Sequence, residues 1–587
     1  MVDFTRLLRR ALSTVMIGIV AAGCAANRGN GTFADTVYTN GKIYTVNEAQ
    51  PWAEAVAIKD GEFIIVGSNA DVEKMTSDNT KVVGLGGKFV MPGIVDMHAH
   101  PFTGVELGTG AISLTEPTSP DAMVAAVKEY VEANPGKRTA LGGNWNVGGV
   151  FENDSPDKKL LDEVAPNAAV FLLSQSGHSG WANSKALELA GIDENYQNSG
   201  NYIFDRYPGT NEPSGTVRES AMVFIVSTLG YMSAEDFEPF LPAEIDRYSR
   251  FGVTAIQSAE GSASWLRAAA SLEEEGRLNV RFFPALDWLT SQLRATNDDD
   301  TKAFIDDWKS YETELIKPHY VKIFGDGAAD SHTQWMKEPF ADAPDDYGSM
   351  YLPIDQYREA ILYYHSKGMT PHVHALGDRT AAEIISIFED AEAANPDSPA
   401  VLHLGHAQLV DDEDLDRLAA LKKVTVDFSP MLAVPAPPMK MFLTDPLGDE
   451  RHQQIYPVRK ALDRGIVAGF GSDFPSSLVP EPNQFWYMEG WVTRQFPGQP
   501  GLGSINKSQA ITVEEAIRGF TLGGAEALGY GYSKVFGSIE SGKSADFIVL
   551  DRNLLEIPAT EIHETEVQTT IFRGRVVFDG EVAEAAP

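Results

Sequence analysis

Short apolar runs alternate with amphipathic stretches through the middle of the chain. The apolar runs have the length of buried strands, and they cover residues 93–98, 253–258, 280–287, 320–325, 370–374, 401–406, 424–428 and 467–472. Helical periodicity separates several of them, for instance over 355–366, 379–394 and 411–421. Eight strands with helical crossovers predict an α/β fold, a (β/α)8 TIM barrel. A doubly wound sheet is the alternative, and the many polar residues at the C-terminal ends of the strands argue against it.

Both ends of the chain carry a different pattern, in which apolar residues alternate over short stretches. These stretches are 36–46, 55–67, 81–90, 545–550 and 569–578, with hairpin signals at Asn40-Gly41 and Asp60-Gly61. One β-sandwich built from both termini, residues 35–90 and 536–582, accounts for them. The barrel then takes residues 91–103 and 241–535. Residues 104–240 are too many for one crossover, so we expect an insertion domain there that roofs the barrel.

The first residues have the pattern of an export signal. Arg6, Arg9 and Arg10 precede a short apolar stretch that ends at Cys24. This resembles a lipoprotein signal over residues 1–23, with Cys24 lipidated and residues 24–34 as a tether. An ordinary secretory signal is the alternative. We therefore expect an exported protein of the periplasm or cell envelope, held on the outer membrane.

Cys24 is the only cysteine, so neither a disulfide within the chain nor a thiolate metal site is possible. The formal net charge is −36, and this acidic field repels nucleic acid and anionic membrane faces. We therefore expect a small-molecule substrate, no nucleic-acid partner, and membrane contact only through the lipid. The oligomeric state does not follow from the sequence.

Polar side chains stand where several of the predicted strands end. They are His98, His100, Lys322, His374, His406 and Asp473. His98 and His100 are two residues apart, so they face the same side of a strand. Strand ends of a TIM barrel converge on one face, so the six side chains are expected to meet there. His372 and His403 are interpreted as facing the opposite side of their strands, where they pack.

Imidazole and carboxylate ligands predict a divalent metal. Zn²⁺ suits them best, with Mn, Fe, Co or Ni as alternatives. A lysine in a buried strand is costly unless it is paired or modified. An ammonium group cannot bind a cation, but its carbamate has two oxygens that can bridge two ions. If Lys322 binds metal, the carbamate is the form that we expect.

Several segments resemble motifs of the amidohydrolase superfamily, and more closely of its amidohydrolase-3 (YtcJ-like) branch. They are MPGIVDMHAH, HALGDRT, GSDFP and the C-terminal GSIESGKSADFIVLDRN, together with GHSGWANSKAL and GGNWN in the insertion. The resemblance covers roughly residues 35–580. It implies that His98, His100 and Asp473 bind one ion, that carboxylated Lys322 bridges to a second ion on His374 and His406, and that Asp473 also accepts the proton of the attacking water.

The resemblance implies a metal-dependent hydrolase of small-molecule C–N bonds other than peptide bonds, of the amide, N-acyl, N-formyl or cyclic amide type. A bound cation lowers the pKa of water to about 7, so hydroxide is the expected nucleophile. Ester or lactone hydrolysis is an alternative, and a non-catalytic lipid-anchored binding protein is another. Candidate substrate contacts are Asn144, Trp145, His178, Trp181 and His332, for which ordinary packing is the competing interpretation.

Overall fold

The computed structural model describes residues 33–103, 112–114, 119–145, 150–151, 155–174, 178–198, 202–229, 238–288, 298–436, 439–479 and 481–580. The predicted signal, Cys24 and most of the tether lie outside these residues. Within the described part of the chain, no helix has both the length and the apolar character needed to cross a membrane.

Eight parallel strands form the central sheet. They are β8 (Ile94–Ala99), β15 (Val253–Ser258), β16 (Arg281–Asp287), β17 (Tyr320–Phe324), β18 (Thr370–His374), β19 (Leu402–Gly405), β20 (Val424–Phe428) and β21 (Val467–Phe470), in chain order across the sheet. The two end strands approach each other, because the N–H of Asp473 donates to the carbonyl of His98 (2.6 Å) and the N–H of His100 to that of Phe474 (2.8 Å). This confirms the (β/α)8 barrel and excludes a doubly wound order.

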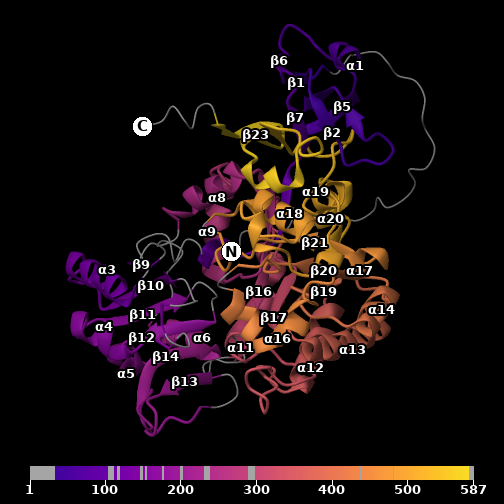
Figure 1. Ribbon diagram of the computed structural model, residues 1–587. Coiled ribbons are helices and arrows are strands. Elements are labelled where there is room, and N and C mark those ends of the chain that lie inside the picture. The colour runs from indigo at the N-terminus through magenta and orange to yellow at the C-terminus, as the bar shows by residue number, and fades with distance from the viewer. Residues whose placement is uncertain are drawn as a thin grey trace, which may run out of the picture.

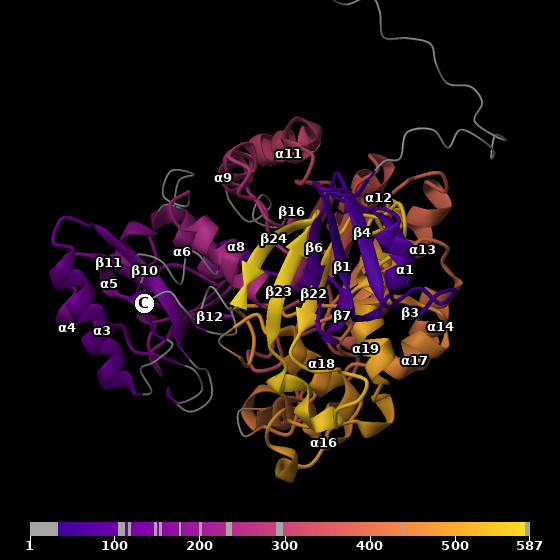
Figure 2. The same ribbon diagram turned by 90° about the horizontal axis from the view of Figure 1, so that it is seen from above.

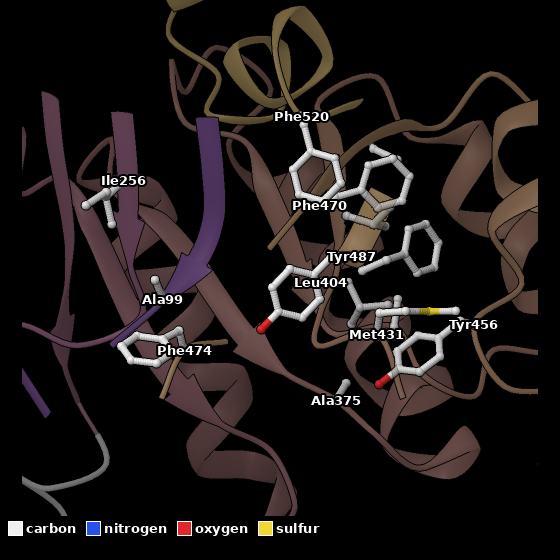
Figure 3. Close-up of a cluster of buried hydrophobic side chains, with 14 of the residues drawn as sticks. Ala99, Ile256, Ala375, Leu404, Met431, Tyr456, Phe470, Phe474, Tyr487 and Phe520 are labelled. Atoms are coloured by element: carbon white, nitrogen blue, oxygen red, sulfur yellow. The ribbon is translucent and has the colours of Figure 1, made fainter. Parts of the chain in front are cut away.

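Helices surround the barrel (Figure 1). They include α9 (Ala263–Glu274), α12 (Ile354–Ser366), α13 (Asp378–Ala394), α14 (Asp412–Ala420), α17 (Val458–Asp463), α18 (Gln484–Thr493), α19 (Val513–Gly519) and α20 (Leu522–Ala527). Their apolar faces pack on the strands in one large core, part of which Figure 3 shows around Leu404, Phe470 and Phe520. The rings of Phe470 and Phe520 are 5.3 Å apart. Each such fully buried side chain contributes about 1.5–3 kcal/mol to folding.

Two sheets form the β-sandwich, and the second contains strands from both ends of the chain (Figure 2). The first has the order β5 (Glu62–Gly67), β4 (Ala55–Lys59), β1 (Thr36–Thr39), β6 (Lys81–Gly84). The second has the order β24 (Arg575–Asp579), β23 (Val567–Phe572), β22 (Phe547–Leu550), β7 (Phe89–Pro92), β2 (Lys42–Tyr44), β3 (Trp52–Ala53). Tyr38, Phe63 and Phe547 pack between the sheets, with ring separations of 5.1 and 5.8 Å.

The Asn40-Gly41 turn differs from the expected hairpin. Asp60-Gly61 joins the antiparallel strands β4 and β5 as predicted. Asn40-Gly41 instead carries the chain from β1 in one sheet to β2 in the other. Asn40 has a left-handed φ of 57°, and a Cβ on Gly41 would lie 2.6 Å from Leu85, so the crossing is tight.

The segment between β8 and the helix α8 (Leu241–Arg250) carries its own mixed sheet beside the barrel (Figure 1). Its order is β13 (Tyr202–Arg206), β14 (Pro213–Glu219), β12 (Ser179–Ala182), β11 (Ala169–Ser174), β10 (Thr139–Trp145), β9 (Ile112–Ser113). The helices α3 (Pro120–Ala133), α4 (Lys158–Val164), α5 (Ser184–Leu189) and α6 (Ser220–Leu229) accompany it. The residue boundaries expected between sandwich, barrel and insertion stay predictions.

Candidate functional site

The six predicted side chains lie together at the C-terminal ends of the barrel strands. Nε2 of His98 is 3.2 Å from Nζ of Lys322 and 3.7 Å from a carboxylate oxygen of Asp473. Nε2 of His100 is 3.1 Å from the same oxygen of Asp473. The ring of His406 lies 4.2 Å from that of His98 and 4.4 Å from that of His374.

Two of these residues follow their strands in a left-handed backbone conformation. His406 has φ 64° and Asp473 has φ 54°. Such non-glycine conformations are unfavourable and cluster where function requires a particular side-chain direction. Gly471 permits the close approach of this segment to the first strand, because a Cβ there would lie 2.6 Å from the backbone nitrogen of His98.

Protein acceptors fix the proton position on two of the histidine rings. Nδ1 of His98 is 3.2 Å from both carboxylate oxygens of Asp427, and Nδ1 of His406 is 2.7 Å from the carbonyl of Ser429. These acceptors require a proton on Nδ1, so each neutral ring keeps its lone pair on Nε2. Burial lowers the pKa of both rings and keeps them neutral. A neutral imidazole with Nδ1 held by the protein is the usual form of a histidine metal ligand.

His374 has a buried ring nitrogen that no protein group occupies among the described residues. Its side chain is buried, and its Nε2 has no hydrogen-bond partner among the described residues. The nearest carboxylate, on Asp326, is 3.8 Å away. Burial holds the pKa of His374 well below its usual value, so the ring is neutral and offers a lone pair at Nε2 when its proton is on Nδ1.

His100 differs from the other three histidines because its pKa is raised rather than lowered. Its Nδ1 is 3.4 Å from Glu260 and its Nε2 faces Asp473. Burial alone lowers the pKa of His100, but the two carboxylates outweigh it and raise the pKa to about 9. Glu260 also accepts from the N–H groups of Phe102 and Thr103, both at 2.9 Å, and so fixes the turn after His100.

Lys322 is the buried cation of the site, with 1% of its surface exposed. Burial lowers the pKa of its ammonium to about 8, although Asp473 and Asp427 oppose this shift. Its Nζ contacts Nε2 of His98, an acceptor, and lies 4.8 Å from the ring centre of Phe324. A neutral amine, the form that burial favours here, is also the form that reacts with CO₂.

The sequence interpretation missed Asp427 and was wrong about His372 and His403. Both histidines point inward, with Nε2 atoms 3.5 and 2.9 Å from Asp427. His372 and His374 are two residues apart and therefore share a face, which the interpretation overlooked. Although burial raises the pKa of Asp427, the histidines around it hold the pKa well below its usual value. The polar Asp427 in the apolar strand VTVDF was the available signal.

Asp427→Asn is expected to weaken divalent-metal binding by about 10–100-fold, the usual effect of removing a carboxylate that orients a ligand histidine. The amide loses the negative charge that fixes the Nδ1 proton of His98. Competition with a calibrated chelator measures the affinity. Asp342→Asn is the control, because Asp342 pairs with His332 away from this cluster. An unchanged affinity for Asp427→Asn would contradict the orienting role.

The predicted substrate residues of the insertion occupy different surroundings. His178 lies nearest the barrel histidines, with its ring 6.0 Å from that of His374. Trp145 and Trp181 are buried in the core of the insertion, and Nε1 of Trp181 donates to the carbonyl of Asp157 (3.0 Å). His332 pairs with Asp342 (2.9 Å) and packs on Phe340. The side chain of Asn144 lies outside the described residues.

Glu219, another residue missed from the sequence, ties the insertion to the barrel. It ends β14 with φ 52° and accepts from Nδ1 of His178 (2.9 Å). The hydroxyls of Ser331 and Thr333, from the loop after β17, donate to the same carboxylate at 2.7 and 2.6 Å. Although burial opposes ionisation, the charge and hydrogen bond of His178, together with the hydroxyl of Thr333, lower the pKa of Glu219 to about 2. The segment with His178 is thereby fixed beside His374.

The donor set fits a divalent cation. His98, His100 and Asp473 offer three ligand atoms within 4.8 Å of one another, without movement of the backbone. The free lone pair on His374 and the oriented ring of His406 lie beside them. Imidazole nitrogen and carboxylate oxygen together are the ligands of catalytic zinc and related ions.

Comparisons with known proteins agree with this arrangement. A family model described as the amidohydrolase family matches residues 81–578. The chain is 27% identical over 552 residues to the putative amidohydrolase YtcJ of Bacillus subtilis, covering 92% of this chain and 99% of that protein. It is 26% identical over 558 residues to an N-substituted formamide deformylase of Arthrobacter pascens, covering 93% and 98%.

The fold is also that of a solved structure. An uncharacterized metal-dependent hydrolase from Pyrococcus horikoshii superposes with a TM-score of 0.68 at 22% identity, covering 89% of this chain and 99% of that one. The likeness extends over barrel, sandwich and insertion together. Because the family model spans most of the sequence, the chain belongs to the amidohydrolase family and is a metal-dependent hydrolase of carbon–nitrogen bonds.

Proposed function

We propose that the protein hydrolyses an N-acyl, N-formyl or cyclic amide bond of a small molecule with two Zn²⁺ ions. His98, His100 and Asp473 hold one ion, His374 and His406 hold the other, and carboxylated Lys322 bridges them. The main support for this proposal is that His98, His374 and His406 each have an Nε2 atom in the same cluster. Nδ1 of His98 and His406 is bound to protein acceptors, and the unpartnered Nε2 of His374 lies in the same cluster.

A bound divalent ion supplies Lewis acidity, which lowers the pKa of water and polarises a carbonyl group. Asp473 is the proposed general base. Its carboxylate lies 3.1 Å from Nε2 of His100 and its side chain keeps 11% of its surface exposed, so we assign it the transfer of a proton from the attacking water to the leaving nitrogen. Glu260 and Asp427 hold the rings of His100 and His98 in place during this transfer.

His178 is the residue of the insertion best placed to contact substrate. Its ring lies beside that of His374, and Glu219 fixes its Nδ1. Trp145 and Trp181 shape the insertion through packing with Phe151, whose ring is 6.1 and 5.0 Å from theirs. Asn144 stays a proposed substrate contact on the basis of the sequence. His332 is the weakest candidate for substrate contact, because its ring pairs with Asp342.

The similarity to an N-substituted formamide deformylase favours N-formyl and N-acyl substrates. Ester or lactone hydrolysis is the second candidate, because the same attack reaches either acyl carbon. A non-catalytic binding protein is disfavoured by the complete ligand set. Turnover on a panel of N-acyl amino acids, N-substituted formamides, cyclic amides and lactones tests these possibilities. Hydrolysis of lactones alone would overturn the C–N assignment, and no turnover by metal-loaded protein would favour the binding protein.

We further propose that the mature chain begins at lipidated Cys24 and is held on the outer membrane. The support is the signal-like pattern before Cys24, with Ala25 next to it. Mass spectrometry of the mature N-terminus is expected to find an acylated Cys24, and Cys24→Ser is expected to release the protein from the membrane fraction. An unmodified N-terminus at another residue would contradict lipidation.

A further inference from the structure

A second group of ligand-type side chains lies inside the barrel beside Lys322. In the parallel register, Lys322 pairs with His372, His372 with His403, and His403 with Thr425. Paired residues on neighbouring strands point the same way, so these side chains all face the barrel interior. Asp427 follows Thr425 by two residues and also faces inward, within reach of both histidines.

His372 has no explanation within the chemistry proposed so far. It is 0% exposed, and neither ring nitrogen has a hydrogen-bond partner among the described residues. The contact that Nε2 does make, with Oδ2 of Asp427 at 3.5 Å, is longer than an ordinary hydrogen bond, and a cation shared by the two groups would pair both of them. Gly405 lacks a side chain where this ring lies, since a Cβ there would be 2.8 Å from Nε2 of His372.

Both oxygens of Asp427 lie 3.2 Å from Nδ1 of His98, and each oxygen has further neighbours of its own. Oδ1 accepts from the N–H of His406 (3.2 Å) and from the hydroxyl of Ser429. Oδ2 faces Nε2 of His403 at 2.9 Å and Nε2 of His372 at 3.5 Å. Ligands about 2.0–2.1 Å from a tetrahedral ion lie about 3.3 Å from one another. The two observed separations lie on either side of that value.

We propose that Asp427, His372 and His403 hold an additional divalent cation of the late first-row type, for which Zn²⁺ is the probe. His403 binds through Nε2 when its proton resides on Nδ1, and the hydroxyl of Thr425, 2.7 Å away, accepts from that position. The cation balances the negative charge of Asp427 and gives a ring nitrogen of His372 a binding partner. Asp427 also contacts Nδ1 of His98. A cation bound to Asp427 in this inner site therefore restricts the movement of a ligand of the metal site formed by the six residues, which we call the outer site.

This inference rests on the proposed function and adds one ion to it. Its test therefore compares the zinc content per chain of each variant with that of wild type. Wild type, His372→Ala, His403→Ala, His374→Ala and the control His365→Ala are loaded with Zn²⁺, dialysed and analysed for zinc per chain. His365 is also buried, but it lies on α12 outside the barrel interior. We expect His372→Ala and His403→Ala each to hold one ion fewer than wild type, and His365→Ala to match wild type.

Equal zinc content in wild type, His372→Ala and His403→Ala would overturn the inner site. His374→Ala tests the proposed function separately, because His374 belongs only to the outer site. An ion lost in this variant comes from the outer site and leaves the inner ion bound. Unchanged zinc content in this variant would contradict the role of His374 as a ligand. Diffraction at the zinc absorption edge gives a result that does not depend on how the variants fold. An anomalous peak between Oδ2 of Asp427 and the Nε2 atoms of His372 and His403 is expected in zinc-loaded wild type, and its absence would overturn the proposal.

Discussion

Lys322→Ala is expected to lose bound metal and hydrolytic activity together. The lysine is buried on β17 beside Nε2 of His98, at the centre of the ligand cluster. In the proposed function its carbamate would supply an oxygen ligand to each ion, so its removal would weaken both sites. A short carboxylic acid such as acetate or propionate is expected to take the place of the carbamate and to restore part of both properties. Zinc content and initial rates, measured with and without the acid, check this.

Lys317→Ala is the matched control for this experiment. Lys317 precedes the same strand at the opposite end of the barrel and pairs with Glu312 (3.0 Å) near the surface. It is expected to keep wild-type metal content and activity. Near-wild-type turnover by Lys322→Ala would show that the bridging role assigned to this lysine is wrong for this protein.

Asp473→Asn is expected to keep substantial metal while kcat falls by about 10²-fold or more, the usual scale for loss of a general base. This corresponds to about 2.7 kcal/mol or more of transition-state stabilisation. The amide retains an oxygen that can bind the ion, but it cannot accept the proton of water. The left-handed backbone at Asp473 suits asparagine as well as aspartate, so the fold is not expected to suffer.

Asp342→Asn serves as the control for Asp473→Asn, because it changes a carboxylate that pairs with His332 outside the cluster. Rates with saturating substrate, and zinc content of the same samples, separate loss of chemistry from loss of metal. If Asp473→Asn turned over at the wild-type rate, the general base would have to be another residue. If it lost all metal, Asp473 would act mainly as a ligand.

The sequence was sufficient for the barrel and for the cluster, because both depend on local patterns. His98 and His100 share a face through strand periodicity alone, and Lys322 stands out as a cation in an apolar run. His406 lies in the cluster although it breaks that periodicity. The strand ends at Gly405, and a φ of 64° at His406 redirects the side chain toward His374.

The residues that orient the cluster were not predictable in the same way. Glu219 and Thr333 are 114 positions apart in the sequence, and their hydrogen bond exists only once the insertion packs on the barrel. Glu260 follows β15 without a recognisable motif and becomes meaningful only through its contact with His100. Asp427 was visible in its strand, but its three histidine neighbours come from three other strands.

The most direct test of the central claim is metal analysis of catalytically active protein. Once a substrate has been found in the panel, the same sample is assayed before chelation, after chelation and after return of Zn²⁺ or Mn²⁺. We predict that transition metal is bound at the start, that metal and activity fall together with a strong chelator, and that both return with the added ion. Full activity in protein that contains no bound transition metal would contradict the account.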